Sequence, residues 1–231
     1  MTPDQLLARV LYRDQDVIVL DKPAGLPVHA GPNAPDHLEL YLPALSFGWA
    51  QAPRLAHRLD RDTSGCLLLG RHDKAIRRLG KLFMAHRVDK TYWTVVLGGP
   101  KAEAGVADFP ILKVTARGQS WRIVVDPAGQ PAVTEWRVLG RGALAGQPMA
   151  WLECRPRTGR THQIRVHAKA LGCPVLGDAY YGPDPAPQVP LHLHARALSL
   201  PALSEAKAAI SVVAPPPAHM RDALAACGWS E

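Results

Sequence analysis

The stretch from His57 to Gly65, with the sequence HRLDRDTSG, most constrains what this chain can fold into. Two carboxylates and two arginines stand among turn-forming residues, directly before the apolar run 66–70. A short apolar run bounded by turn residues is typical of a buried strand. The predicted strand is therefore entered through a charged loop, where the edge of a core can position a carboxylate and control its ionisation.

Either acid of this loop could carry chemistry. Asp62 suits a structural role, because Asp62 to Gly65 is good turn chemistry and an Asp there often accepts bonds from its own backbone. That role fits Asp60 less well, since Asp60 precedes the turn residues. Spacing alone does not choose between the two acids. Thr63 and Ser64 are expected to be turn and backbone partners rather than reactants.

Composition indicates a folded chain with a basic surface. The 231 residues are 47% hydrophobic and 20% charged, which favours a sizeable core over disorder. The formal net charge is +7, and Arg outnumbers Lys by 19 to 8. The guanidinium of arginine binds phosphates bidentately and stacks on bases better than the ammonium group of lysine does. The charge alone is compatible with a polyanionic partner or with a generally basic surface.

The four cysteines lack the CxxC spacing of a metal or redox motif, and most of them lie in apolar runs. Buried free thiols in a reducing compartment are the expected state. The first nine residues contain no signal-peptide core, and no apolar run approaches 18 residues. We therefore expect a soluble cytoplasmic protein that makes no membrane contact.

Hydrophobic periodicity predicts an α+β fold, formed as one domain over 1–231 around a mixed, mostly antiparallel sheet flanked by helices and loops. Hairpins are predicted at 11–20 and 121–139, and the segment 100–118 is predicted to be irregular. Further strands are predicted at 67–69, 92–97, 149–155, 192–200 and 210–213, and helices at 37–45, 73–87, 161–171 and 218–227. The helix at 73–87 has the clearest pattern, with apolar residues on one face and cations on the other: Lys74, Arg77, Arg78 and Lys81.

A second charged segment, 155–167, reads RPRTGRTHQIRVH. Thr158-Gly159 predicts a tight turn, and Thr161 or a neighbour is expected to cap the helix that follows. A helix N-terminus among several arginines favours anions such as phosphate, although a solvated basic face would look the same. Arg165 differs from the other cations, because it lies at the margin of the apolar stripe. A half-buried cation needs an anionic partner.

The segment 90–96, with Tyr92 near its start, is an ordinary strand by pattern, and a core tyrosine is the expected role on that basis. The segment 21–29, DKPAGLPVH, predicts a stiff loop because its prolines and Gly25 restrict the backbone. We assign no catalytic role to Lys22 or His29.

Together these segments resemble the pseudouridine synthases of the RluA type. The match includes HRLDxxTSG at 57–65, RTGRTHQIRVH at 157–167, DKPAGLPVH at 21–29 and the tyrosine at position 92. The matching motifs occur in the order and at the approximate spacing of the family, over about residues 11–215. Relatives often carry an additional N-terminal RNA-binding domain. Only about ten residues precede the first predicted strand, so that domain is expected to be absent.

The resemblance implies an enzyme that isomerises uridine to pseudouridine in ribosomal or transfer RNA, without a cofactor. It assigns Asp60 as the catalytic carboxylate, Tyr92 as the residue against the target base, and Arg165 as the partner of Asp60. An adjacent Arg165 would favour the ionised form of a buried Asp60. RNA contacts are expected from Arg58, Arg61, Arg157, Arg160 and His162. RNA is the expected partner, and the protein is expected to act as a monomer without an obligate protein partner.

Several alternatives stay open at this point. Asp60 could attack the ribose or assist an elimination. Arg58 could enter the RNA stack in place of the extruded uridine, or could instead pair with Asp62 or with a phosphate. The chain could also be a catalytically idle RNA-binding or RNA-folding protein on the same scaffold, or an N-glycosidase that releases uracil.

A metal site is not expected. His192 and His194 point to one face of a predicted strand, and His162 and His167 lie on one predicted helix. No carboxylate or thiolate completes a recognisable ligand set around either pair.

Overall fold

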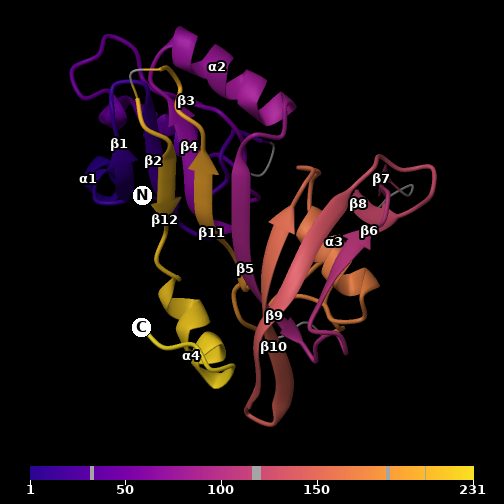
Figure 1. Ribbon diagram of the computed structural model, residues 1–231. Coiled ribbons are helices and arrows are strands. Elements are labelled where there is room, and N and C mark those ends of the chain that lie inside the picture. Colours follow the sequence, from indigo (N-terminus) through magenta and orange to yellow (C-terminus); the bar gives the residue numbers. More distant parts are fainter. Residues whose placement is uncertain (32–33, 116–120, 186–187, 206) are drawn as a thin grey trace. The chain divides into compact units, whose positions relative to one another are not determined.

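The computed structural model describes residues 1–31, 34–115, 121–185, 188–205 and 207–231 (Figure 1). The chain divides into two compact units. Unit 1 contains Met1–Lys90 and Ala195–Pro216, and unit 2 contains Thr91–His194 and Pro217–Glu231. Two strands, β5 (Asp89–Leu97) and β11 (Leu193–Leu200), contain boundaries between the units. The expectation of one domain over 1–231 stays a prediction.

Unit 1 is built on a sheet with the strand order β1–β2–β4–β11, in which β12 pairs with β11 and β3 with β4. The pairs β1–β2, β2–β4, β3–β4 and β11–β12 are antiparallel. Helix α2 lies over this sheet against β4 (Figure 1). The bounds in unit 1 are α1 (Pro3–Leu7), β1 (Val10–Arg13), β2 (Val17–Lys22), β3 (Arg54–Leu55), β4 (Ser64–Gly70), α2 (Asp73–Met84) and β12 (Ile210–Val213), with two 3₁₀ helices, η1 (Leu38–Leu40) and η2 (Leu42–Leu45).

Strand β4 is the centre of the core of unit 1, and every one of its residues is buried. The apolar run that follows the charged loop is therefore a buried strand, as the sequence predicts. Gly65, at its start, has a φ of +103°, and a Cβ there would lie 2.3 Å from the carbonyl oxygen of Ala195. No other residue fits at this position, so the glycine allows β11 to approach the end of the charged loop.

Unit 2 contains a sheet with the order β5–β10–β9–β6, and its pairs are also antiparallel. Helix α3 packs on β9 and β10, helix α4 packs on β9, and β7 and β8 form a separate two-stranded sheet. The bounds in unit 2 are β6 (Ala104–Asp108), β7 (Ile111–Val114), β8 (Arg122–Val125), β9 (Val133–Leu144), β10 (Gln147–Pro156), α3 (Gln163–Ala170) and α4 (Ala218–Ala226). The α+β class and the mostly antiparallel pairing are thus confirmed.

The predicted elements fail where pairing partners are distant in sequence. The segment 100–118 is not irregular, because it contains β6 and β7, although 116–118 lies outside the described residues. Strand β8 pairs with β7 and not with β9, so the predicted hairpin at 121–139 is wrong. Strands β7 and β8 are each too short for an alternation of apolar and polar residues to be recognised in the sequence. The predicted helix at 37–45 is two 3₁₀ turns, and α2 ends three residues earlier than predicted, before His86, whose φ is +52°.

None of the helices in the described part of the chain is long and apolar enough to cross a membrane. All four cysteines are buried free thiols, as the sequence predicts.

Candidate active site

The charged loop of unit 1 forms a tight turn that Asp60 opens. The amide of Thr63 donates to the carbonyl oxygen of Asp60 at 3.2 Å, so Arg61 and Asp62 occupy the two central positions. Asp62 is therefore a turn residue, as expected. Leu59 and Thr63 are buried on either side, whereas Asp60 is half-buried. The turn thus holds Asp60 at the edge of the core, just before the start of β4.

His57 attaches this loop to the sheet. Its Nε2 accepts a hydrogen bond from the amide of Leu68 at 2.9 Å, and its ring packs at 5.1 Å from the ring of Phe83 on α2. Burial first, and then the nearby Lys90, lower the pKa of His57 to about 4. At neutral pH the imidazole is therefore uncharged, as its accepting nitrogen requires.

Lys22, which the sequence reading left without a role, lies beneath the same loop. Only 1% of the residue is exposed, and its Nζ donates to the carbonyl oxygens of Pro23, Leu26 and Arg61 at 2.8, 2.8 and 2.9 Å. Three acceptors match the three protons of an ammonium group. Burial lowers the pKa of Lys22 to about 7, against the opposing charges of Asp62, Asp60 and Asp21. Lys22 therefore ties the stiff loop at 23–26 to the Asp60 turn.

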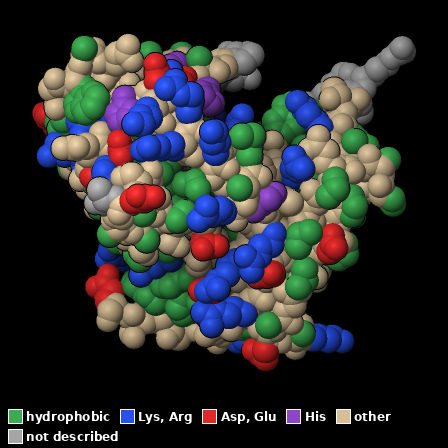
Figure 2. Space-filling view, turned by 45° about the horizontal axis from the view of Figure 1, so that its top comes forward, with side chains coloured by type: hydrophobic (Ala, Val, Ile, Leu, Met, Phe, Trp, Pro, Cys, Tyr) green, Lys and Arg blue, Asp and Glu red, His purple; other side chains and the backbone are tan. Residues whose placement is uncertain are grey.

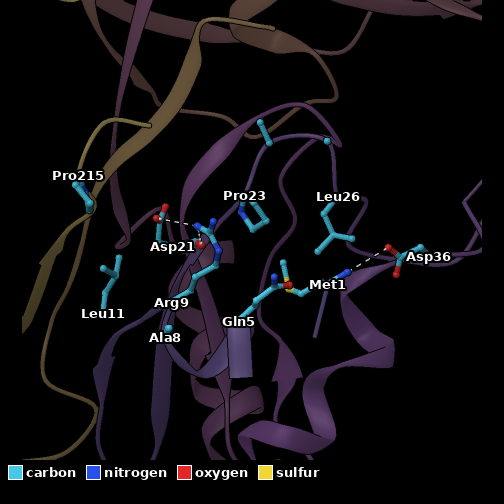
Figure 3. A pocket seen from close by; sticks show the side chains of 12 residues that line it. Met1, Gln5, Ala8, Arg9, Leu11, Asp21, Pro23, Leu26, Asp36 and Pro215 are labelled. Carbon is cyan, nitrogen blue, oxygen red and sulfur yellow. Dashed lines mark hydrogen bonds and ion pairs between the residues drawn. The ribbon is translucent and has the colours of Figure 1, made fainter. Parts of the chain in front are cut away.

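A pocket of about 790 Å³ opens beside the loop at 23–26 (Figure 3). Helix α1, strand β1 and this loop line it, and two acids on its walls are paired with cations. Arg9 lies 3.3 Å from Asp21, and the amino group of Met1 lies 3.9 Å from Asp36. Burial raises the pKa of Asp21, although Arg9 and Lys22 oppose the rise. The pocket thus borders the loop that Lys22 holds, without an unpaired acid on its described wall.

The two arginines of the charged loop have different surroundings. Arg61 lies 3.9 Å from Asp62 and donates to the carbonyl oxygen of Gly25 at 3.3 Å. Arg58 is exposed, and its guanidinium has no ion-pair or hydrogen-bond partner within the described ranges. The alternative in which Arg58 pairs with Asp62 is therefore not what the structure shows. Arg58 can reach an external ligand, whereas Arg61 closes the turn.

In unit 2, Arg165 has an acidic partner that the sequence reading missed. Its Nε and Nη2 donate to the two carboxylate oxygens of Asp178, both at 2.7 Å, and both residues are buried. One oxygen of Asp178 also accepts the amides of Tyr180 and Tyr181 at 2.9 and 3.0 Å. The guanidinium is thereby fixed in orientation by a carboxylate whose own position is fixed. A buried acid directly after an apolar run, 175–177, was the signal that could have revealed it.

The start of α3 carries an aromatic cluster around His162. The helix begins at Gln163, and its N-cap is His162, the neighbour of Thr161, with a φ of +54° and no side-chain hydrogen bond to the first turn of the helix. Nδ1 of His162 lies 2.8 Å from the hydroxyl of Tyr181, and its ring lies near those of Trp121 and Tyr180. Tyr180 is 58% exposed and Trp121 is 38% exposed. The cluster offers aromatic surface on which a base could stack.

Of the remaining predicted residues of unit 2, Arg157 and Arg160 are exposed and Tyr92 packs on the core. Arg157 forms two bonds with Glu135, at 2.8 and 2.7 Å, on the exposed face of the sheet. Arg160 is exposed and donates to the carbonyl oxygen of Pro131 at 3.3 Å. Tyr92 lies on β5 opposite Cys154 and packs against the core of unit 2. Tyr92 and Arg165 thus belong to unit 2 and Asp60 to unit 1, so the assembly of the three stays a prediction.

Within the described residues no group of three or more His, Cys, Asp or Glu side chains is arranged to hold a metal ion.

Comparison with known proteins decides the family. Residues 16–170 match the sequence profile of the RNA pseudouridylate synthases. The chain belongs to this family of RNA pseudouridine synthases. Its members are isomerases that convert uridine to pseudouridine in RNA, which confirms the resemblance inferred from the motifs and the class of reaction.

Relatives of this synthase are similar over most of its length. An uncharacterised RNA pseudouridine synthase of Zymomonas mobilis is 46% identical over 178 residues, which cover 77% of this chain and 80% of that protein. A mitochondrial pseudouridylate synthase of Xenopus tropicalis is 36% identical over 201 residues, covering 77% and 61%. The solved structure of human RNA pseudouridylate synthase domain containing 4 superimposes with a TM-score of 0.78 at 32% identity, covering 96% of this chain and 94% of that one.

Proposed function

We propose that this synthase isomerises specific uridines of ribosomal or transfer RNA, with Asp60 as its catalytic carboxylate. The observation that carries the proposal is the position of Asp60 as the opening residue of a turn, half-buried just before the start of β4. His57 and Lys22 hold the backbone around the turn, so the carboxylate is presented from a rigid support. Preorganisation of this kind is what catalytic groups require.

The reaction needs no external group. The bond between N1 of the uracil and C1′ of the ribose breaks, and a bond from C5 to C1′ forms. The proton of C5 is released, and N1 gains one. A carboxylate can assist by attack on C1′ or by removal of a ribose proton during elimination, and both routes need Asp60 ionised. Tyr92 would contact the turned base and could receive the proton from C5.

Arg165 has a modified role in this proposal. Asp178 binds two nitrogens of Arg165 and so fixes the direction of its guanidinium. We infer that Arg165 orients its remaining N–H groups toward the reacting centre, and that Asp178 is the positioning residue behind it. The target uridine must leave its stack to react, and Arg58, exposed beside the turn, is the proposed residue that enters the space it leaves.

The decisive experiment measures tritium release from RNA labelled at C5 of uridine, with the purified chain and RNA alone. Asp60→Asn should lower kcat by about a thousandfold or more, because a catalytic carboxylate is removed. Asp62→Asn is the matched control, two residues further on in the same turn, and should retain activity within about tenfold. Equal activity of the wild type and Asp60→Asn would overturn the assignment.

The same assay separates the alternatives. An idle RNA-binding protein would release no label from any cellular RNA, and an N-glycosidase would yield free uracil. Mapping pseudouridines in total RNA with and without the gene then identifies which RNA and which uridine are modified.

A further inference from the structure

The exposed face of α2 carries four cations in eight residues. Lys74, Arg77, Arg78 and Lys81, here called the α2 stripe, are spaced at three and four residues and therefore lie along one side of the helix. The opposite side is buried through Ala75 and Leu79. Figure 2 shows Lys and Arg side chains gathered on the upper part of the face it presents, over the region of α2.

Within the described ranges, the α2 stripe is not neutralised by acidic side chains of the protein. None of its four cations has an ion-pair or hydrogen-bond partner in the part of the chain that the structure describes. The acid nearest to it in the helix, Asp73, is paired with Arg54. By contrast, the exposed arginines of β9 and β10 are paired with glutamates: Arg137 and Arg155 with Glu153, and Arg141 with Glu103.

The cations of the α2 stripe destabilise the helix that carries them. Every neighbouring pair in the stripe, at a spacing of three or four residues, brings like charges together. Lys74 also places a cation in the first turn, where the helix dipole favours anions. An anionic ligand along the stripe would remove both penalties at once.

The last turn of α2 carries Lys81 on its exposed side and contacts the charged loop through its opposite side. The last turn of α2 packs through Phe83 on His57, and the next residue in the chain is Arg58. From Lys81 to Lys74 the stripe then follows the helix for about 10 Å. A strand of RNA with its target uridine at Asp60 would thus meet Arg58 first and could continue over α2.

We propose that the α2 stripe binds the phosphates of the RNA strand that flanks the target uridine. This inference rests on the proposed function and extends it to a second contact surface in unit 1. Contacts to phosphates position an RNA without reading its sequence. The stripe therefore contributes to affinity and leaves the chemical step unchanged.

The test compares two variants with the same change in net charge. In the stripe variant, Lys74, Arg77, Arg78 and Lys81 are replaced by Gln. In the control variant, four exposed cations of unit 2 are replaced by Gln: Lys101, Arg141, Lys169 and Arg221. Binding of a labelled 20-nucleotide oligouridine is measured from 50 to 300 mM KCl. Circular dichroism verifies that each variant retains its helix content.

Each phosphate contact on a single strand contributes about 0.7 to the slope of log K against log salt concentration. The stripe variant should therefore lose up to about 3 from this slope, and the control variant much less. Equal losses in both variants, or none in the stripe variant, would overturn the proposal. An acidic protein surface would then be the better candidate for what binds there.

Activity gives an independent measure. With an RNA that the wild type modifies, the stripe variant should show a KM raised at least tenfold and a kcat within about twofold. A wild type that binds oligouridine through the stripe but modifies no RNA would contradict the proposed function and leave the phosphate-binding proposal supported.

Discussion

Lys22 in unit 1 and Arg165 in unit 2 are both almost completely buried, but their charges are stabilised in opposite ways. Lys22 donates to three neutral carbonyl oxygens, and burial lowers its pKa to about 7. Arg165 donates to a carboxylate that is itself held by two amides. The lysine joins the loop at 23–26 to the Asp60 turn and stays sensitive to pH. The arginine fixes one direction in space and keeps its charge at any pH that the fold tolerates.

The largest effect should follow from breaking the pair in unit 2. Asp178→Asn leaves the guanidinium of Arg165 buried against a neutral partner, and should lower the free energy of unfolding by about 3–5 kcal/mol. Urea unfolding measures the loss. The double variant Arg165→Met, Asp178→Asn should lose less, because no buried charge remains and the Asn oxygen still accepts the amides of Tyr180 and Tyr181. A double variant less stable than the single one would show that the charge is not the cause.

Lys22→Met should cost about 1–3 kcal/mol at pH 7, because three carbonyl oxygens lose their donor. It should also change how stability depends on pH. Between the folded pKa of about 7 and the ordinary value of 10.5, the unfolded chain binds a proton that the folded chain does not. The free energy of unfolding of the wild type therefore gains from this group as pH rises through that interval, and below pH 7 the gain is absent.

Urea unfolding at pH 7.0 and 9.5 measures this dependence. Lys22→Met should lose the rise that the wild type shows, and Lys101→Met, at an exposed position, should keep it. A rise that survives in Lys22→Met would assign the pH dependence to another group.

The smallest effect is expected at the surface. Arg157 and Glu135 form the same two-bond geometry as Arg165 and Asp178, but their side chains are 55% and 40% exposed. Arg157→Gln should therefore change the free energy of unfolding by less than about 1 kcal/mol, and less still in 0.5 M salt. A cost near that of Asp178→Asn would mean that geometry, and not burial, decides what such a pair contributes.

Local patterns in the sequence were sufficient for much of the fold. The buried strand β4 and the amphipathic helix α2 each carry a period that identifies them without knowledge of their neighbours. Strands β6, β7 and β8 do not, because four or five residues show no clear period and their pairing depends on distant segments. The left-handed backbone at His162, which delays the start of α3, has no signal in a sequence that otherwise suits a helix.

In the candidate site, too, local patterns predict some features and contacts between distant segments decide the others. Contiguous residues are sufficient to predict the turn at Asp60 and to recognise the family. The supports of the site are not: Lys22 lies 39 positions from the carbonyl of Arg61, and Asp178 lies 13 from Arg165. A sequence can reveal that a buried cation needs a partner, but the fold decides which of several acids or carbonyls provides it. Only those contacts show that Lys22 holds the Asp60 turn and that Asp178 holds Arg165.

The buried cysteines provide chemical reporters of opening for both units. Cys66 belongs to unit 1, and Cys154 and Cys173 belong to unit 2. Burial raises the pKa of these thiols to about 12, 12 and 11, so almost no thiolate exists at neutral pH while the units are closed. An alkylating reagent would therefore label the cysteines of each unit only when that unit unfolds enough to expose them. Mass spectrometry of the labelled peptides could then follow the opening of the two units separately, in the wild-type chain and without an engineered probe.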